Sequence, residues 1–482
     1  MEKNCALEKN KLIAVADALT LEGDGVVHSL PGKTIFCKSL LPGEKAEIEI
    51  VSEKKNYRVA KLVRVMTPSS ARVAPECPVF SKCGGCSLLH LSYEAQKAQK
   101  KEHVQSCLQR IGGFSEKDMA RWIRDTIGMK NPRRYRNHVQ YQVRKASGNS
   151  CQIGFFEENS HNIVEIEDCL LTPSAGAKLC AAIKEFCQAH AISAYDEKEE
   201  NGLLRKISFR FGFNTGEIMI ILELSEEEKE VFSGLLEYLQ TSIRGEKIGD
   251  RLWEIKSVWG SVLPSVSARR KTKGKFFHLS GEKNIFEKIG DKKFRISPSA
   301  FFQVNSEQTK TLYDTICDFA VGKNKENPIH FLLDLYCGSG TIGIYLSKYT
   351  KALLGVEINP ASIKDALENA RINQVTNFQF IEGKAEFLEK EQLAEMPDCV
   401  ILDPPRKGCD KKLLDMVISL LPKKLIYTSC DPATLARDLK ILVEGGFSIE
   451  AVQPVDMFPG TGHIECVVLM SRKDRGREGQ MY

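Results

Sequence analysis

The sequence contains no long apolar run and no apolar core near its beginning. Its longest uninterrupted candidate, residues 218–222, is the size of a strand, whereas a membrane-spanning helix needs about 18 consecutive apolar residues. The opening residues, MEKNCALEKNK, are too polar for the core of a secretion signal. No internal repeat is present. We therefore expect no membrane segment, no secretion and a cytoplasmic location.

Cysteine, in contrast, is abundant, with 16 among 482 residues. Thiols stay reduced in the cytosol, so close groups of cysteines indicate metal binding rather than disulfides. Cys77, Cys83 and Cys86 form one such group, with C-x5-C-x2-C spacing. The cluster therefore predicts a metal centre that needs a fourth ligand from elsewhere in the chain.

Positive charge is concentrated in one stretch. The net charge is only +5, yet residues 91–150 contain 13 Lys and Arg against 5 Asp and Glu. An excess of this kind is typical of a surface that binds a polyanion, and nucleic acid is the first candidate. A solvated helix face explains the charge equally well.

The length predicts two or three domains, which we place at residues 1–70, 71–290 and 291–482. Short alternating strands separated by Gly and Pro turns predict a small OB-like barrel in the first. A basic helix over residues 93–111 and a β-rich region over 135–281 predict an α+β domain. From residue 328 the chain alternates apolar strands with helices, which predicts a parallel α/β sheet closed by an antiparallel pair.

The strand ends of this last domain carry the residues that indicate a ligand. The first predicted strand leads into DLYCGSGTIG, where Gly338 and Gly340 permit a tight turn near a ligand. The second ends at Glu357, an acid placed to bind ribose hydroxyls. The fourth ends in DPPRKG, with Asp403, an element that many S-adenosylmethionine methyltransferases use to hold a base and that dehydrogenases lack.

A cysteine and a second acid are expected at the same edge. Cys430 follows the fifth strand and precedes a helix, whose dipole favours a thiolate. Glu465 begins the final strand. A thiolate that adds to carbon 6 of uracil activates carbon 5 for methylation, and a base then removes the carbon 5 proton. Cys430 fits the nucleophile and Glu465 the base, while Cys409 and Cys466 are weaker candidates for the thiol.

These motifs extend over nearly the whole chain, from GDGVVHSLPGKTIF and PECPVFSKCGGCSLLHLSY to SPSAFFQVN, YTSCDPATLARDL and FPGTGHIECV. The chain resembles the bacterial RNA (uracil-5-)-methyltransferases, in particular the 23S ribosomal RNA branch. The resemblance implies an N-terminal TRAM barrel, a central iron–sulfur domain and a Rossmann-like class I methyltransferase domain. It also implies S-adenosylmethionine as methyl donor.

The resemblance assigns roles to individual residues. It makes Cys430 the nucleophile and Glu465 the base, and it places Gln303, Tyr336, Glu357 and Asp403 at the methyl donor or the target uracil. Phe301 and Phe302, beside Gln303, are candidates either for stacking on a flipped base or for core packing. Lys384 stands where many methyltransferases have an acid that holds adenine, so the adenine contact stays unassigned.

The resemblance also completes the cysteine group with Cys169. Four thiolates bind either a [4Fe-4S] cluster or zinc, and the ribosomal RNA branch carries the cluster, which favours iron–sulfur in a supporting rather than a catalytic role. For RNA contact we single out Arg133, Arg134 and Arg136 for phosphates and Tyr135 for stacking, with an exposed basic strand edge as the alternative.

The resulting hypothesis is an enzyme that methylates carbon 5 of a specific uridine in 23S ribosomal RNA, with no obligate protein partner evident. The alternatives are a transfer-RNA member of the same family, a non-catalytic RNA chaperone and an amino-methyltransferase that needs no thiol. The transfer-RNA branch is disfavoured here because it typically lacks the barrel and the cysteine group.

Overall fold

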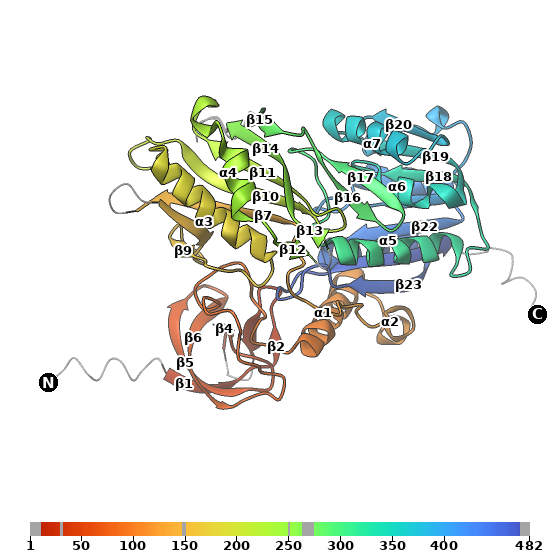
Figure 1. Ribbon diagram of the computed structural model, residues 1–482. Helices are drawn as coiled ribbons and strands as arrows, with labels where there is room; N and C mark the ends of the chain where they lie inside the picture. Colours follow the sequence, from red (N-terminus) through yellow and green to blue (C-terminus); the bar gives the residue numbers. More distant parts are fainter. Residues whose placement is uncertain (1–10, 29–31, 147–150, 249–250, 263–273, 473–482) are drawn as a thin grey trace, which may run out of the picture.

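The computed structural model describes residues 11–28, 32–146, 151–248, 251–262 and 274–472. Its elements form three parts in Figure 1: a small sheet in red, a larger sheet in yellow and green, and a third sheet with helices in green to blue. Over these residues no helix is both long and apolar enough to cross a lipid bilayer.

The first part is a six-stranded sheet that closes on itself. Its order is β1-β5-β6-β4-β3-β2, so β1 and β2 stand at opposite edges although only a bend at residues 16–17 separates them. The amide of Ala16 donates to Glu44 at 3.3 Å and that of Asp17 to Val26 at 2.7 Å, so the bend bonds to both edges. The strands are β1 (Lys11–Val15), β2 (Ala18–Leu19), β3 (Asp24–Val27), β4 (Thr34–Lys38), β5 (Lys45–Glu53) and β6 (Tyr57–Thr67).

The second part is a seven-stranded sheet whose inner strands β10 and β11 are buried on both faces. Ile218, Ile220 and Leu222 pack on one face with α3 and α4, whereas Met219 and Ile221 pack on the other with the third part. This explains why the strand reads as a continuous apolar run. The order is β15-β14-β11-β10-β7-β8-β9. The elements are β7 (His138–Lys145), β8 (Cys151–Phe156), β9 (Ile163–Glu165), α3 (Ser174–Ala189), β10 (Leu204–Gly212), β11 (Glu217–Leu224), α4 (Leu235–Ser242), β14 (Glu254–Val262) and β15 (Lys275–Gly281).

The third part begins with a hairpin and continues as the predicted β/α alternation. Its seven-stranded sheet has the order β20-β19-β18-β21-β22-β24-β23. The elements are β16 (Ile285–Ile289), β17 (Lys292–Ile296), α5 (Ser306–Val321), β18 (Ile329–Leu335), α6 (Thr341–Leu346), β19 (Thr350–Glu357), α7 (Pro360–Ile372), β20 (Phe378–Glu382), β21 (Cys399–Leu402), α8 (Lys411–Leu420), β22 (Lys424–Ser429), α9 (Pro432–Glu444), β23 (Phe447–Val455) and β24 (Glu465–Arg472).

The final two strands pair antiparallel, as predicted, but not in chain order across the sheet. β24 lies between β22 and β23 and runs antiparallel to both. β23 is therefore the edge strand, and the connection over residues 456–464 brings the chain back into the sheet. As a result, the first residue of β24 lies at the same sheet edge as the last residue of β22.

The helices that follow the cysteine segment belong to the third part by packing. α1 (Tyr93–Cys107), a π-helical turn (Leu108–Gly112) and α2 (Glu116–Trp122) bury Val104, Leu108 and Met119 in the core under β23 and α9. The domain boundary that the sequence predicts at residue 290 assigns these helices to the central domain, although they share the core of the third part. Their apolar residues are few and widely spaced, so the sequence carried little sign of this docking.

Shortening Leu108 tests that docking, because its side chain is fully buried whereas Ile111 in the same turn is 44% exposed. We expect Leu108→Ala to lower the free energy of unfolding by about 2–5 kcal/mol, as for other buried leucines. Ile111→Ala is the matched control and should change it by less than about 0.5 kcal/mol. Urea titrations followed by circular dichroism measure both. Equal effects would contradict the shared core.

Candidate active site at the carboxyl edge of the third sheet

The predicted site residues lie along one edge of the third sheet. β18, β19, β21 and β22 are parallel and end at this edge, where they lead to Tyr336, Glu357, Asp403 and Cys430. Ser429 pairs with Cys466 across β22 and β24, so the next pair along the two strands is Cys430 and Glu465. The structure therefore brings together the thiol and the three acids that the sequence proposed.

The glycine loop after β18 is tied to the end of β19. Tyr336, Gly338 and Gly340 all have positive φ, at 64°, 55° and 74°. Glu357 accepts a hydrogen bond from the Gly338 amide at 3.2 Å, and its other oxygen accepts one from the Asn359 amide at 2.7 Å. A side chain built on Gly338 would meet nothing within 4 Å, so the backbone of the loop faces open space.

Glycine serves a different purpose at Gly340 and Gly343. A Cβ at Gly340 would lie 2.9 Å from the Phe380 ring, and one at Gly343 would lie 2.9 Å from Leu353. These glycines therefore let α6 pack closely on the sheet. The loop provides the tight turn that the sequence predicted and, in addition, lets the helix pack closely.

Asp334 is the first residue of the glycine motif DLYCGSGTIG, and the sequence alone assigned it no role. Its side chain is fully buried, one oxygen accepts from the Gly343 amide at 3.2 Å, and the other has no partner. Burial, with a smaller contribution from Asp403, raises the pKa of Asp334 to about 8. Its position at the start of the glycine motif was the available signal.

Cys430 and Glu465 both hold their protons tightly. Burial raises the pKa of the Cys430 thiol to about 11, the charges of Glu465 and Asp403 add to this, and Arg406 opposes it. Glu465 is 6% exposed, and burial followed by Asp403 raises its pKa well above the ordinary range. Because this edge is poorly hydrated and two acids lie beside the thiol, ionisation of any of these groups is unfavourable there.

The expectation of a thiolate stabilised by the helix dipole is wrong for this state of the protein. Asp431 caps α9, and one of its oxygens accepts from the amides of Ala433 and Thr434 at 2.9 Å. The first free amides of the helix are thus taken by a carboxylate. Cys430 lies outside this cap, so burial, followed by the charges of Glu465 and Asp403, sets the direction of its pKa.

The two competing thiols are less accessible. Cys409 is 7% exposed and Cys466 is fully buried, whereas Cys430 is partly exposed. Burial raises the pKa of Cys409 to about 12. Among these three, Cys430 is the thiol that a substrate at the sheet edge can reach.

The two adjacent phenylalanines before α5 lie in different environments. Phe301 is 72% exposed, whereas Phe302 is 8% exposed and packs in the core. Only Phe301 therefore remains a candidate for stacking on a base. The backbone carbonyl of Gln303 accepts from the Asn137 amide group at 2.8 Å, which ties this segment to the second part. Lys384 places its ammonium 5.3 Å from the centre of the exposed Phe387 ring.

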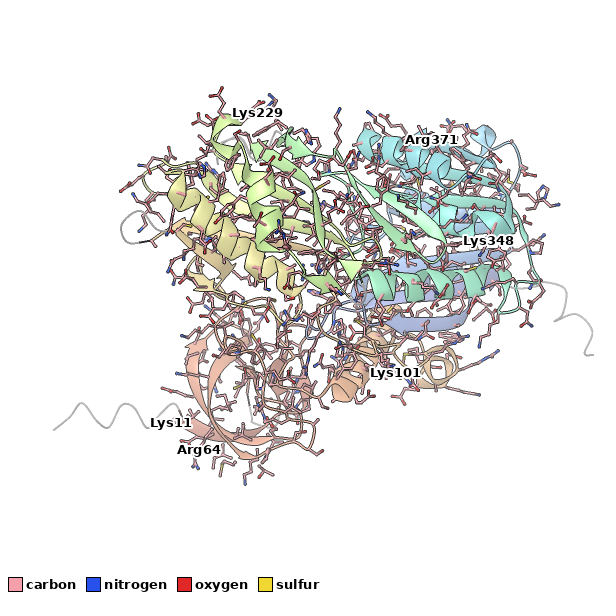
Figure 2. The ribbon with its side chains drawn as sticks, in the orientation of Figure 1. Lys11, Arg64, Lys101, Lys229, Lys348 and Arg371 are labelled. Carbon is pink, nitrogen blue, oxygen red and sulfur yellow. The ribbon has the colours of Figure 1, made fainter. Side chains whose placement is uncertain are left out.

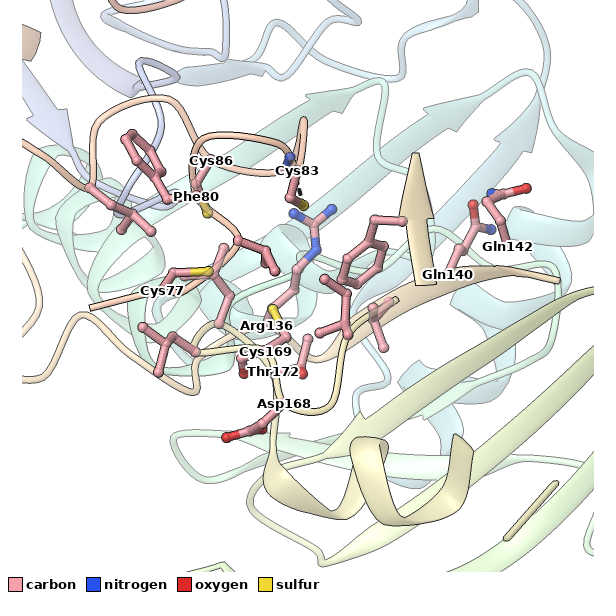
Figure 3. A pocket seen from close by; sticks show the side chains of 18 of the residues that line it. Cys77, Phe80, Cys83, Cys86, Arg136, Gln140, Gln142, Asp168, Cys169 and Thr172 are labelled. Atoms are coloured by element: carbon pink, nitrogen blue, oxygen red, sulfur yellow. Dashed lines mark hydrogen bonds between the residues drawn. The ribbon is translucent and has the colours of Figure 1, made fainter. Parts of the chain in front are cut away.

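The four predicted metal-binding cysteines line one cavity of about 310 Å³, shown in Figure 3. Cys77, Cys83 and Cys86 come from the loop before α1, and Cys169 follows β9 from the second part. Burial raises the pKa of Cys83 and Cys169, and neighbouring thiols add to it. In the described ranges, however, no three His, Cys, Asp or Glu side chains stand close enough together to hold a single metal ion.

The structure contradicts the predicted RNA-stacking role of Tyr135. Its ring is 3% exposed, and its hydroxyl donates to the Pro459 carbonyl at 3.0 Å. Arg133 pairs with Glu76, and Arg134 forms a two-armed pair with Asp168. Arg136 donates to the His138 carbonyl at 3.0 Å and lines the cysteine cavity. The sequence could not reveal these partners because all but His138 are distant along the chain.

The basic excess over residues 91–150 is also largely paired. Seven of its thirteen cations form ion pairs: Lys97, Lys100, Lys101, Arg133, Arg134, Arg144 and Lys145. Figure 2 labels basic side chains on all three parts, from Lys11 on the first to Lys348 and Arg371 on the third. The predicted single basic face is therefore weaker in the fold than in the sequence.

The strand order, the glycine loop and the acid after the second strand define a class I S-adenosylmethionine-dependent methyltransferase fold. A model of the tRNA (uracil-5-)-methyltransferase family matches residues 282–473. An RNA methyltransferase of Bacillus cereus is 41% identical over 475 residues, which are 97% of this chain and 98% of the relative. One from Halalkalibacterium halodurans is 40% identical over 479 residues, 98% of this chain and 100% of the relative. The chain belongs to the RNA (uracil-5-)-methyltransferase family.

A solved structure shares the whole architecture. It is the Pyrococcus abyssi tRNA (uracil-54, C5)-methyltransferase in complex with S-adenosyl-L-homocysteine, with a TM-score of 0.73 and 28% identity. The similarity covers 95% of this chain and 100% of that one.

The raised pKa of Cys430 is directly testable by alkylation. Because iodoacetamide reacts with the thiolate, we expect the rate at Cys430 in the free protein to rise about tenfold per pH unit from pH 7 to 9 without levelling off. Peptide mapping by mass spectrometry separates this cysteine from the others. A plateau below pH 8 would show a low pKa and contradict the inhibitory effect of the two acids.

Proposed function

We propose that the protein transfers a methyl group from S-adenosylmethionine to carbon 5 of a uridine in 23S ribosomal RNA. The observation that carries the chemistry is that Cys430, directly after β22, and Glu465, the first residue of β24, meet at one sheet edge next to Asp403, because Ser429 pairs with Cys466. A nucleophilic thiol and a base on one sheet edge are what carbon 5 methylation of a pyrimidine requires.

The methyl donor fits the residues at the same edge. The open backbone at Gly338 leaves space for a ligand, and Glu357 and Asp403 offer carboxylate oxygens to hydroxyl or amino groups. When bound, S-adenosylmethionine supplies an electrophilic methyl group next to a positive charge. Tyr336, whose hydroxyl donates to Glu386 at 3.2 Å, forms the adjacent wall.

The protein groups act in two stages. Cys430 and Glu465 both carry protons in the free protein, so each first releases its proton to solvent. The Cys430 thiolate then forms a bond to carbon 6, and the electrons of the carbon 5–carbon 6 double bond move onto the oxygen at carbon 4. Carbon 5 would accept the methyl group that bound S-adenosylmethionine supplies, as the carbonyl at carbon 4 forms again. Glu465 next accepts the carbon 5 proton, the double bond forms again, and the carbon 6–sulfur bond breaks with its electrons returning to Cys430.

We also propose that Cys77, Cys83, Cys86 and Cys169 hold a [4Fe-4S] cluster. A zinc ion bound at about 2.3 Å would hold its sulfurs within about 4 Å of one another, which a single-ion site requires. The described thiols instead line a cavity of about 310 Å³ without forming such a site, which favours a larger group. Methyl transfer consumes no electron, so we assign the cluster a structural role.

Transfer RNA remains the second candidate substrate. The sequence disfavoured it because that branch typically lacks both the barrel and the cysteine group. The Pyrococcus tRNA enzyme nevertheless covers 95% of this chain, and β1 to β6 make up more than a tenth of it. The barrel therefore does not exclude transfer RNA. The cysteine group and the sequence motifs support the ribosomal substrate.

A methylation assay tests the activity. Purified protein is incubated with methyl-labelled S-adenosylmethionine and either 23S ribosomal RNA or transfer RNA, and the RNA is digested to nucleosides. We expect 5-methyluridine from ribosomal RNA and a loss of at least about 10³-fold for Cys430→Ala, because the covalent route is closed. Cys466→Ala is the matched control. Label on cytidine or ribose would contradict methylation at carbon 5 of uridine. Label on transfer RNA alone would show that the substrate is transfer RNA rather than 23S ribosomal RNA.

Metal analysis tests the cluster. Protein purified without oxygen should contain about four irons and four sulfides per chain, with visible charge-transfer absorption. Cys169→Ser should lower both contents, whereas Cys187→Ser, a buried cysteine outside the cavity, should not. A content of one zinc and no sulfide per chain would show that the four cysteines hold zinc instead of the cluster.

A further inference from the structure

The connection between β23 and β24, residues 456–464, is held by groups from distant parts of the chain. It ends one residue before Glu465, so its position sets the start of β24. None of the mechanistic steps above uses its residues. Its contacts nevertheless exceed what a surface loop needs, and they lead to the cysteine segment.

Gly460 has both of its backbone polar groups engaged. Its amide donates to the Gln96 side-chain oxygen at 2.9 Å, and its carbonyl accepts from the amides of Ser87 and Leu88 at 3.0 and 2.9 Å. Gln96 is 5% exposed and also donates to the carbonyls of Leu88 and Leu91 at 3.0 and 2.8 Å. The same glutamine therefore fixes the cysteine segment and the connection relative to each other.

Pro459 is held by Tyr135, the residue that the sequence suggested for stacking on RNA. The Tyr135 hydroxyl donates to the Pro459 carbonyl at 3.0 Å, and its ring packs with Met129 and Leu171, beside Cys86 and Cys169. Tyr135 thus contacts the connection with its polar end and the cysteine cavity region with its ring. A buried hydroxyl with one partner is a specific attachment, because no water replaces a lost bond easily.

The start of the connection is anchored by a buried ion pair. Lys100 and Asp456 are 1% and 0% exposed, their charged atoms lie 2.5 Å apart, and Lys100 also donates to the Phe458 carbonyl at 3.1 Å. The first part closes the other side: a Cβ on Gly462 would lie 1.7 Å from the Leu21 carbonyl oxygen. The connection is therefore enclosed on several sides by fixed groups.

We propose that Gln96 and Tyr135 are positioning residues for Glu465. They hold the peptide between Pro459 and Gly460 so that the carboxylate meets the carbon 5 proton of the uracil adduct. The proposal rests on the proposed function and adds to it a role for α1 and the cysteine segment. A misplacement of about 1 Å at a reacting group costs about 10²-fold in rate, so two buried hydrogen bonds can control the step.

The expected defect is confined to the last chemical step. Thiol addition and methyl transfer use Cys430, which the connection does not carry. Proton removal from carbon 5 uses Glu465, and until it occurs the carbon 6–sulfur bond cannot break. When Glu465 is misplaced, the methylated RNA stays attached to Cys430. A positioning defect therefore raises the amount of adduct while it lowers turnover, whereas a general loss of folded enzyme lowers both.

Tyr135→Phe removes only the hydroxyl that bonds to Pro459. We expect a turnover about 10- to 100-fold lower, an unchanged KM for RNA, and a several-fold larger fraction of enzyme in a methyl-labelled covalent complex on denaturing gels. Tyr141→Phe is the matched control: Tyr141 is also buried, and its hydroxyl lies 3.5 Å from Thr172. It should match the wild type in both measurements. Gln96→Leu, which removes the independent contact to Gly460, should reproduce the tyrosine variant.

The outcomes separate this proposal from the proposed function. Unchanged turnover, or adduct that falls in proportion to turnover in both variants, overturns the positioning role. If either variant fails to fold by circular dichroism, the other decides by the same two measurements, and a folding failure of both overturns a role specific to the last step. Wild-type protein is tested in parallel with RNA that contains 5-fluorouridine. No adduct there in an active preparation would reject the covalent mechanism itself.

Discussion

The insertion of β24 between β22 and β23 is the constraint on which the site depends. A parallel strand in that place would carry its first residue to the opposite edge of the sheet. Because β24 runs antiparallel, Glu465 begins it at the edge where Cys430 follows the end of β22, and two residues that are distant along the chain become neighbours. The antiparallel strand thus places the proposed base beside the proposed nucleophile, while the preceding parallel strands lead to the glycine loop and to the two acids proposed to hold the methyl donor.

This arrangement has an electrostatic cost that the chemistry must overcome. Cys430, Asp403 and Glu465 share an edge in which burial raises the pKa of each group, and repulsion from neighbouring acids adds to the pKa of Cys430 and of Glu465. Arg406 is the cation that opposes this for both Cys430 and Glu465. A site that begins neutral needs a further positive charge before a thiolate forms readily. Bound S-adenosylmethionine would bring such a charge on its sulfonium, so under the proposed mechanism binding of the donor would favour the Cys430 thiolate by Coulomb attraction.

The sequence predicted what local pattern and strand topology determine. Apolar strands that alternate with helices located most elements of the third part, and strand ends then located Glu357, Asp403 and Cys430. It could not predict what depends on partners far along the chain. Tyr135 is buried because Pro459 and Leu171 approach it, Arg134 is paired because Asp168 does, and the Cys430 pKa reflects Glu465. Charge counted along a stretch likewise overlooked the carboxylates that pair with it in three dimensions.

The same distant contacts explain why the parts of the chain are not independent modules. α1 and α2 fill the core under β23, the Cys86–Leu88 segment bonds to Gly460, and the turn at Leu21 touches Gly462. Each contact reaches the edge strand or the connection that returns the chain to Glu465. The sheet fixes Ser429, the residue before Cys430, and pairs Glu465 with Val455 of β23, but it does not hold the connection that precedes Glu465. The remaining support must come from outside the sheet, and the cysteine segment with α1 occupies that position.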